Sequence, residues 1–167
     1  MEKKVLGIIP ARGGSKGVIR KNIRLVGGQP LITYTIKAAH ASQMLTDYIV
    51  STDDSEIAEF AQSMDCAVLL RPAELAADET PMIPVVEHIL SSLETRGSNY
   101  KYICLLQPTT PLRTANDIDE ALSILVKTGA DSVISVYQVE DHHPSRMYTL
   151  KHGILVPYTE EPSERLR

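Results

Sequence analysis

A loop rich in glycine and positive charge follows the first apolar run of this sequence. It reads Pro10-Ala-Arg-Gly-Gly-Ser-Lys-Gly17, continues to Asn22, and combines three glycines with arginines and lysines. Glycine lets backbone N–H groups approach an anion closely, while lysine and arginine balance the charge of a polyphosphate. These residue types predict a phosphate-binding loop, and the other reading of the same residues is a solvated basic loop.

Two common phosphate-binding fingerprints are absent from this loop. The spacing G-x-x-x-x-G-K-S/T, which cradles the phosphates of ATP, does not occur there, and neither does the dinucleotide pattern G-x-G-x-x-G. The sequence therefore gives no specific support to an ATPase or to an NAD-dependent enzyme.

Three other polar segments each follow an apolar, β-rich run. They are Thr52-Asp53-Asp54, residues 71–80 and residues 107–113. The carboxyl ends of parallel strands meet at one edge of a sheet, which is where α/β proteins bind their ligands. We therefore expect the glycine-rich loop and these three segments to form one site.

The elements that must position these loops alternate along the chain. β-rich runs predict strands at residues 5–9, 48–50, 67–70, 102–106 and 133–139. Helical periodicity predicts helices over residues 30–42, 54–64, 85–97 and 114–129. Because right-handed crossovers place successive strands in one sheet, this order predicts an α/β fold of three layers with a mostly parallel sheet. A hairpin is also expected from residues 147–150 and 154–156.

Composition and charge limit the classes of protein and partner. The chain has 167 residues, 43% of them hydrophobic and 23% charged, and a net charge of -4. These values fit one ordinary globular domain and argue against nucleic acid or an anionic membrane surface as partner. No apolar stretch approaches the roughly 18 residues of a membrane span. Cys66 and Cys104 lie in apolar runs and are interpreted as buried, reduced thiols, which favours the cytoplasm.

The loop and the segments after the later strands together resemble a known family. Residues 9–17 with Lys21-Asn22, Ser51-Thr52-Asp53, residues 70–76 and residues 106–113 are similar, in order, to the sequence blocks of the acylneuraminate cytidylyltransferases. The resemblance covers about residues 4–150 and extends to legionaminate and pseudaminate cytidylyltransferases. It implies a nucleotidyltransferase-type (Rossmann-like) domain that transfers CMP from CTP to a nonulosonic, sialic-type acid and releases pyrophosphate.

The resemblance also implies roles for individual residues. Arg12, Lys16 and Lys21 match the family's catalytic, phosphate-contacting cations. Such a role suits cations, because this chemistry depends on positioning and on neutralising the charge of the triphosphate. The residues implied to bind the nucleotide are Ala11, Gly13, Gly14, Ser15, Gly17, Asn22 and Arg71. Those implied to face the acceptor sugar are Gln107, Thr109 and His143. Mg²⁺ is the expected cofactor, as a counter-ion of the triphosphate.

Two departures from the family pattern affect this assignment. Met82 stands where relatives often have a small hydroxyl residue near the base, and the family's pair of metal-binding aspartates belongs to a later strand, so the metal ligands stay unassigned. We expect residues 1–139 to form the nucleotide-binding core. Residues 140–167 are expected to start an incomplete segment for acceptor and dimer contacts, in a homodimeric enzyme that this chain length leaves poorly active.

Several alternatives remain open from the residues alone. Asp53 and Asp54 follow a strand and precede a helix, a pattern more typical of an N-cap than of a metal site. His142-His143-Pro144 has no third ligand of zinc type nearby, which argues against a zinc site. Arg165 and Arg167 fit two interpretations, a pair that binds the carboxylate of the acceptor or part of a frayed terminal tail. The chain can also be a nucleotidyltransferase for another NTP or sugar, or a nucleotide-binding form without activity. The sequence does not specify which nonulosonic acid is used.

Overall fold

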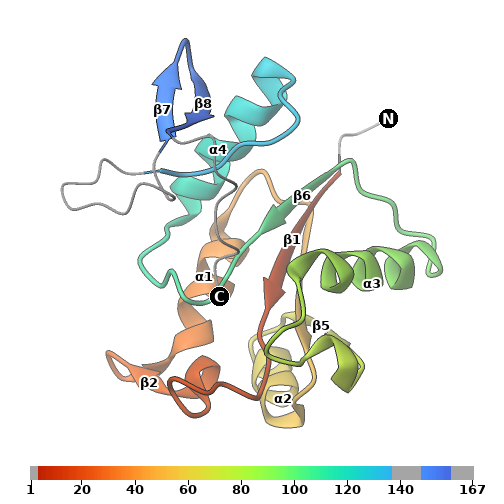
Figure 1. The fold of residues 1–167 in the computed structure, drawn as a ribbon. Coiled ribbons are helices and arrows are strands. Elements are labelled where there is room, and N and C mark those ends of the chain that lie inside the picture. The colour runs from red at the N-terminus through yellow and green to blue at the C-terminus, as the bar shows by residue number, and fades with distance from the viewer. Residues whose placement is uncertain (1–3, 137–147, 159–167) are drawn as a thin grey trace. The chain divides into compact units, whose positions relative to one another are not determined.

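A parallel sheet of four strands forms the centre of residues 1–133 (Figure 1). The computed structural model describes residues 4–136 and 148–158. The strands β1 (Val5–Pro10), β4 (Asp47–Thr52), β5 (Ala67–Leu70) and β6 (Tyr102–Leu105) lie in the order β5-β4-β1-β6, and each neighbouring pair is parallel. The first four predicted strands and the predicted α/β class are confirmed.

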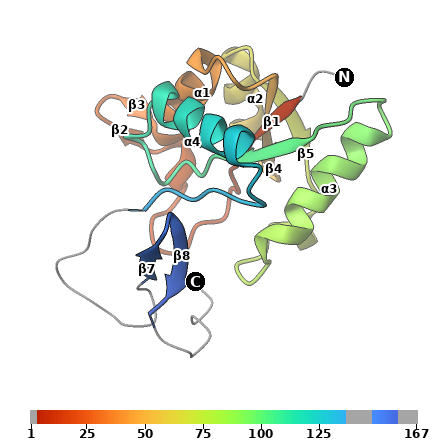
Figure 2. The ribbon, with the colours of Figure 1, turned by 90° about the horizontal axis from the view of Figure 1, so that it is seen from above.

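Helices cover both faces of this sheet, as the view in Figure 2 shows. The helices α1 (Leu31–Ala41), α2 (Ser55–Ser63) and α4 (Ala115–Thr128) pack on one face, and α3 (Met82–Glu94) packs on the other. The four predicted helices are thus confirmed, with ends that differ by a few residues. None of the helices in the described ranges is long and apolar enough to cross a bilayer.

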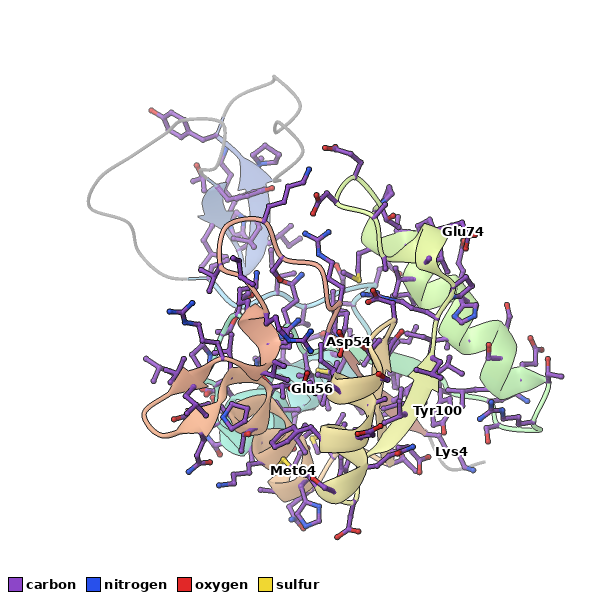
Figure 3. The ribbon with its side chains drawn as sticks, turned by 90° about the horizontal axis from the view of Figure 1, so that it is seen from below. Lys4, Asp54, Glu56, Met64, Glu74 and Tyr100 are labelled. Atoms are coloured by element: carbon purple, nitrogen blue, oxygen red, sulfur yellow. The ribbon has the colours of Figure 1, made fainter. Side chains whose placement is uncertain are left out.

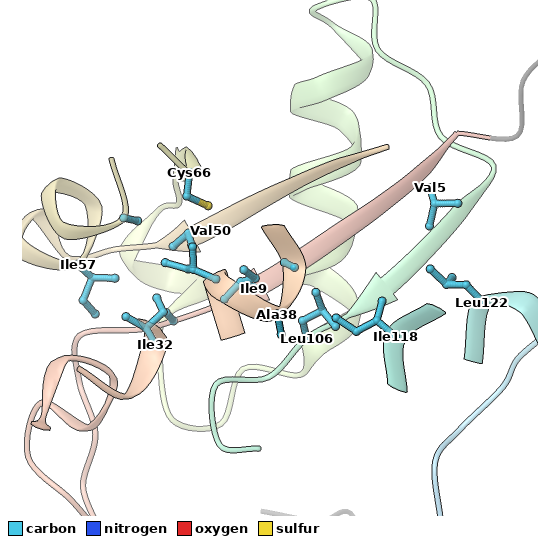
Figure 4. Packing of buried hydrophobic residues seen from close by; sticks show 14 residues of the cluster. Val5, Ile9, Ile32, Ala38, Val50, Ile57, Cys66, Leu106, Ile118 and Leu122 are labelled. Atoms are coloured by element: carbon cyan, nitrogen blue, oxygen red, sulfur yellow. The ribbon is translucent and has the colours of Figure 1, made fainter. Parts of the chain in front are cut away.

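The two apolar cores meet at β1, which contributes alternate side chains to each of them. Val5 and Ile9 belong to the core beneath α1, α2 and α4, which Figure 4 shows, whereas Leu6 and Ile8 belong to the core beneath α3. All four side chains are at most 3% exposed. A continuous apolar run is what a strand buried on both faces requires, and this is why β1 was predictable from its composition.

Local signals determine where the helices begin and end. Asp54 is the N-cap of α2, because its Oδ1 accepts a hydrogen bond from the N–H of Ile57 at 3.0 Å. Thr114 and Asp117 form a capping box at the start of α4, and Gly129 ends that helix in a left-handed conformation with φ 66. The expected N-cap role is therefore confirmed for Asp54.

Short elements that the sequence did not predict lie within the connecting loops. A 3₁₀ helix, η1 (Lys21–Ile23), follows the glycine-rich loop, and β2 (Leu25–Val26) then pairs with β3 (Gln29–Pro30). A second 3₁₀ helix, η2 (Ala73–Leu75), lies in the loop after β5. These turns give the two loops a defined path to and from the carboxyl edge of the sheet.

Residues 134–167 form a second compact unit, of which residues 134–136 and 148–158 are described. Its strands β7 (Tyr148–Lys151) and β8 (Ile154–Pro157) pair antiparallel and confirm the predicted hairpin. His152 and Gly153 make the turn with positive φ values of 52 and 81, as the common two-residue hairpin turns require. The predicted division of the chain after residue 139 falls outside the described residues.

The predicted fifth strand, over residues 133–139, is wrong in its described part. Residues 133–136 have no strand structure, and Ile134 and Val136 are each 59% exposed. β-branched residues favour extended backbone, but a strand also needs a partner, and within the described residues the sheet ends at β6. Residues 137–139 lie outside the described ranges.

Candidate functional site

A pocket of about 280 Å³ lies between the loop after β1 and the loop after β5. The first loop contributes two cations and two small residues, and the second contributes two alanines and a carboxylate. The lining residues are Arg12, Gly14, Ser15, Lys16, Ala76, Ala77 and Asp78. Two of the loops expected to share a site thus meet at the carboxyl edge of the sheet, where parallel α/β folds bind ligands.

The two pocket cations are bridged by one carboxylate. Oδ1 of Asp78 lies 2.6 Å from Nη1 of Arg12, and Oδ2 lies 2.6 Å from Nζ of Lys16. The hydrogen bond and the charge of Asp78 raise the pKa of Lys16, and the hydrogen bond from Lys16 in turn lowers the pKa of Asp78. Both partners are therefore charged at neutral pH, and on this wall of the pocket two cations converge on one carboxylate.

The last residues of β4 and the loop after it hold the glycine-rich loop in place through hydrogen bonds. The N–H of Gly13 donates to Oδ1 of Asp53 at 3.1 Å, and the N–H of Ala11 donates to the carbonyl of Ser51 at 2.9 Å. A Cβ on Gly13 would lie 2.5 Å from Oδ2 of Asp54, so glycine is required there by close approach. Asp53 therefore positions the loop and is not an N-cap, which corrects that reading for this residue.

Two other residues of the first loop act on its conformation. Asn22 is 5% exposed, and its Nδ2 donates to the carbonyl of Arg12 at 2.9 Å. Arg20 has a left-handed backbone with φ 52, and its Nη2 lies 2.6 Å from Oε2 of Glu56 and 3.3 Å from Oδ1 of Asp54. Figure 3 labels both acidic partners at the beginning of α2. Asn22 thus links the end of the loop to its beginning at Arg12, and Arg20 links the end of the loop to the start of α2.

Arg71, the first residue after β5, is a buried cation. It is 7% exposed, its backbone N–H donates to the carbonyl of Thr52 at 2.8 Å, and its side-chain Nε has no partner among the described residues. Burial lowers the pKa of Arg71, Asp53 raises it, and Arg12 lowers it. A buried donor without a partner is costly, so Arg71 is a candidate to contact a ligand.

The other predicted site residues lie outside the pocket lining. Lys21 is half-buried at the start of η1, and Gly17 is exposed in the loop. Gln107 and Thr109 are exposed after β6, where the carbonyl of Gln107 accepts from Nη2 of Arg113 at 3.1 Å. His143 falls outside the described residues. Met82, which departs from the family pattern, begins α3 and packs against the core beneath that helix.

The acidic side chains near the pocket are engaged by the protein's own donors. Within residues 4–136 and 148–158 there is no group of three or more His, Cys, Asp or Glu side chains placed to hold a metal ion. Asp53, Asp54 and Asp78 each accept hydrogen bonds from the protein itself, as described above. The described residues therefore hold no cage of three protein ligands, and the one or two carboxylates that Mg²⁺ typically uses beside a triphosphate stay unassigned.

Asp78 is the pocket residue that sequence reasoning missed. The loop of residues 71–80 was expected at the site, but none of its acidic residues, Glu74, Asp78 and Glu79, was given a role. Asp78 contacts cations that precede it by more than 60 positions, so no local spacing indicates the contact. The available signal was charge complementarity between two loops that leave the same sheet edge.

Comparison with known families gives a match over residues 6–156 to the family described as cytidylyltransferase. An N-acylneuraminate cytidylyltransferase from Escherichia coli is 40% identical over 124 residues, which are 74% of this chain and 29% of that protein. A CMP-N,N'-diacetyllegionaminic acid synthase from Legionella pneumophila is 40% identical over 134 residues, 80% of this chain and 57% of that protein. A pseudaminic acid cytidylyltransferase from Campylobacter jejuni is 33% identical over 138 residues, 82% and 60% respectively.

Solved structures share the fold at low sequence identity. A CMP:2-keto-3-deoxy-manno-octonic acid synthetase complexed with CTP has a TM-score of 0.63 and 19% identity, with 76% of this chain and 49% of that chain covered. A cytidylyltransferase from Leptospira borgpetersenii has a TM-score of 0.60 and 19% identity, with 75% and 50% covered. The chain spans between 29% and 60% of the length of the three relatives named above.

Proposed function

This chain belongs to the cytidylyltransferase family, and we propose that it transfers CMP from CTP to a nonulosonic acid with release of pyrophosphate. The observation that carries the proposal is the pairing of Arg12 and Lys16 on one wall of the pocket beside Gly14 and Ser15. Two cations held 2.6 Å from the two oxygens of one carboxylate suit the oxygens of a phosphate group equally well.

The triphosphate of CTP is proposed to bind at this wall. CTP carries about four negative charges at neutral pH, so Arg12 and Lys16, with Lys21 close by in sequence, offset a large part of them. The buried Arg71, whose Nε lacks a partner, is proposed to contact the nucleoside. Ala11, Gly13 and Asn22 are proposed to serve this site by holding the loop, since each donates a hydrogen bond to another group of the protein.

The proposed reaction is an in-line displacement at the α-phosphorus of CTP. The anomeric hydroxyl of the sugar attacks that phosphorus, its oxygen becomes the bridging oxygen of the product, and pyrophosphate leaves. Catalysis comes from holding the two reactants together and from offsetting the charge that develops on the leaving group. The acceptor is proposed to bind near Gln107 and Thr109, because both follow the carboxyl end of β6, next to β1.

Three further expectations belong to this proposal. Mg²⁺ is included as a counter-ion of the triphosphate, and no residue of the described chain is assigned to it. A homodimer is expected and is testable by light scattering. A cytoplasmic location is supported by Cys66 and Cys104, which are both free thiols, as is common in a reducing compartment. Burial also raises the pKa of Cys66 to about 11, so this thiol stays protonated and unreactive at neutral pH.

The test is a measurement of pyrophosphate release from the purified chain. CTP, ATP, GTP and UTP are each combined with N-acetylneuraminic, legionaminic or pseudaminic acid, with and without Mg²⁺. We expect release with CTP and one of the acids above that with any other nucleotide. Preference for another nucleotide would replace CTP in the proposal, and CTP binding without release would identify a nucleotide-binding form instead.

A further inference from the structure

The carboxylate of Asp78 stands where an anionic ligand is expected to bind. Each of its oxygens contacts a different cation of the pocket wall at 2.6 Å, and this is the arrangement that two oxygens of one phosphate group would adopt. The side chain of Asp78 is 26% exposed, that of Arg12 is 32% exposed and that of Lys16 is 83% exposed. The contact is therefore accessible from solvent and its partners can separate without opening the core.

We propose that Asp78 is a further residue of the anion site, whose carboxylate occupies the place of a phosphate group and is exchanged for the ligand's own anionic group. The ligand class is a polyphosphate, free or as part of a nucleotide. This inference rests on the proposed function only for the identity of that nucleotide, because the exchange itself requires no sugar and no reaction.

Electrostatics favours exchange over simple addition of the ligand. With Asp78 in place, the three side chains carry one net positive charge, and an incoming phosphate would bring like charges close to the carboxylate. Once Asp78 moves away, the ligand meets Arg12 and Lys16, which lie four residues apart on one loop. Both charged groups point to the place that the carboxylate has left. Lys16 is the more exposed partner, so its long side chain can change conformation at little cost.

The exchange has two consequences for the site. In the free protein Asp78 keeps Arg12 and Lys16 from repelling each other, and it therefore positions them. During binding it competes with the ligand, so a singly charged anion gains little from displacing it, whereas a polyphosphate gains contacts with both cations. Asp78 thereby favours highly charged ligands over the single charges of chloride or acetate.

The first test measures the affinity for inorganic tripolyphosphate by calorimetry, at fixed ionic strength and without metal. The variants are Asp78→Asn and the matched control Glu79→Gln, which removes the same charge from the next residue, an exposed one. We expect Asp78→Asn to bind tripolyphosphate roughly two- to fivefold more tightly than the parent chain. The fold-change in affinity that Glu79→Gln causes is expected to be less than about half as large. Equal effects of the two variants, weaker binding by Asp78→Asn, or no binding by the parent chain would each overturn the exchange.

A second measurement follows the Asp78 carboxyl itself by ¹³C NMR during an acid titration. In the free protein the pKa of Asp78 is lowered by its hydrogen bond from Lys16, and we expect it to return to or above its ordinary value when tripolyphosphate is bound. A pKa that stays lowered in the bound protein would mean that the ion pairs persist, which is incompatible with exchange.

The two proposals can fail separately. If tripolyphosphate releases Asp78 but CTP gives no pyrophosphate with any nonulosonic acid, the exchange stands and the proposed function fails. If CTP is turned over while Asp78 keeps its lowered pKa in the presence of tripolyphosphate, the function stands and the exchange is wrong.

Discussion

A Cβ atom on Gly13 would lie 2.5 Å from Oδ2 of Asp54 and 2.8 Å from the Cβ of the same residue. The glycine-rich loop therefore passes directly against the N-cap of α2. Gly14, the next residue, has nothing within 4 Å of such a Cβ and lines the pocket instead. Close packing inside the fold therefore requires glycine at position 13, whereas position 14 has room for a side chain and lines the pocket.

Replacement of Gly13 by alanine is expected to destabilise the protein. The new methyl group must displace Asp54, whose Oδ1 caps α2 through the N–H of Ile57, and loss of an N-cap costs about 1 kcal/mol. The free energy of unfolding in urea measures the effect. Gly14→Ala is the matched control, and we expect it to change stability by less than about 0.5 kcal/mol. A similar loss in both variants would contradict the contact between the loop and α2.

Replacement of Lys16 by alanine is expected to weaken CTP binding and leave stability almost unchanged. The side chain is 83% exposed, so its removal takes nothing from the core, whereas charge-assisted hydrogen bonds to phosphate typically contribute about tenfold or more in affinity. Calorimetric titration with CTP and thermal unfolding measure the two quantities. Lys127→Ala removes the same charge from the end of α4 and serves as control. CTP binding by Lys16→Ala at the parent's affinity would remove Lys16 from the proposed phosphate site.

Arg71 allows a prediction of the opposite kind, in which stability is gained and function is lost. Its guanidinium is buried with Nε unpaired, so Arg71→Met relieves a desolvation cost and is expected to stabilise the fold by up to about 1 kcal/mol. The same variant should bind CTP more weakly, because the proposed nucleoside contact is gone. Urea unfolding and CTP titration check the two effects. A strongly destabilised Arg71→Met would instead mean that the side chain is an integral part of the core.

The parts of the fold that local patterns specify were predictable. Val5 to Ile9 is apolar without interruption because β1 is buried on both faces, and the Thr114 and Asp117 box marks the start of α4 in any context. Residues 133–136 show the limit of this reasoning. Their β-branched side chains satisfy the propensity for a strand, but strand formation depends on a partner that no local pattern reveals.

The sequence indicated the basic loop of the candidate site but not the carboxylate that contacts it. Glycines and basic residues cluster in one loop, which predicts an anion site from composition, and the family resemblance implied Arg12 and Lys16 within that loop; both line the pocket. Asp53 and Asp78 act across the sheet edge, 40 or more positions from their partners, and their roles depend on which side chains the fold brings together. For the same reason, Gly13 looked like an anion-binding glycine, whereas its N–H donates to Asp53 in the structure.

The connection between α1 and α4 gives a pH-dependent prediction. The carboxylate of Asp119 on α4 accepts hydrogen bonds from the hydroxyl of Ser42 and from the N–H groups of Gln43 and Met44, just beyond the end of α1. Burial is the largest single influence on the pKa of Asp119 and raises it, but these three hydrogen bonds together outweigh burial, so the pKa is lowered overall. The folded protein thus favours the ionised form of Asp119.

Asp119→Asn is therefore expected to destabilise the protein by about 1 kcal/mol near pH 7, because the amide cannot accept all three hydrogen bonds. A lowered pKa in the folded state contributes stability that is fully present above the pKa of an unfolded aspartate, about 3.9, and is lost as the pH falls through the folded-state pKa. The difference in unfolding free energy between the parent chain and Asp119→Asn should accordingly be constant from about pH 5 to about pH 8. This difference should shrink below about pH 4. Urea unfolding across this pH range measures it. Glu120→Gln is the control, since the neighbouring exposed Glu120 accepts a hydrogen bond from Asn116 of its own helix. A difference that persists undiminished in acid, or one matched by Glu120→Gln, would show that the Asp119 carboxylate does not join α4 to the end of α1.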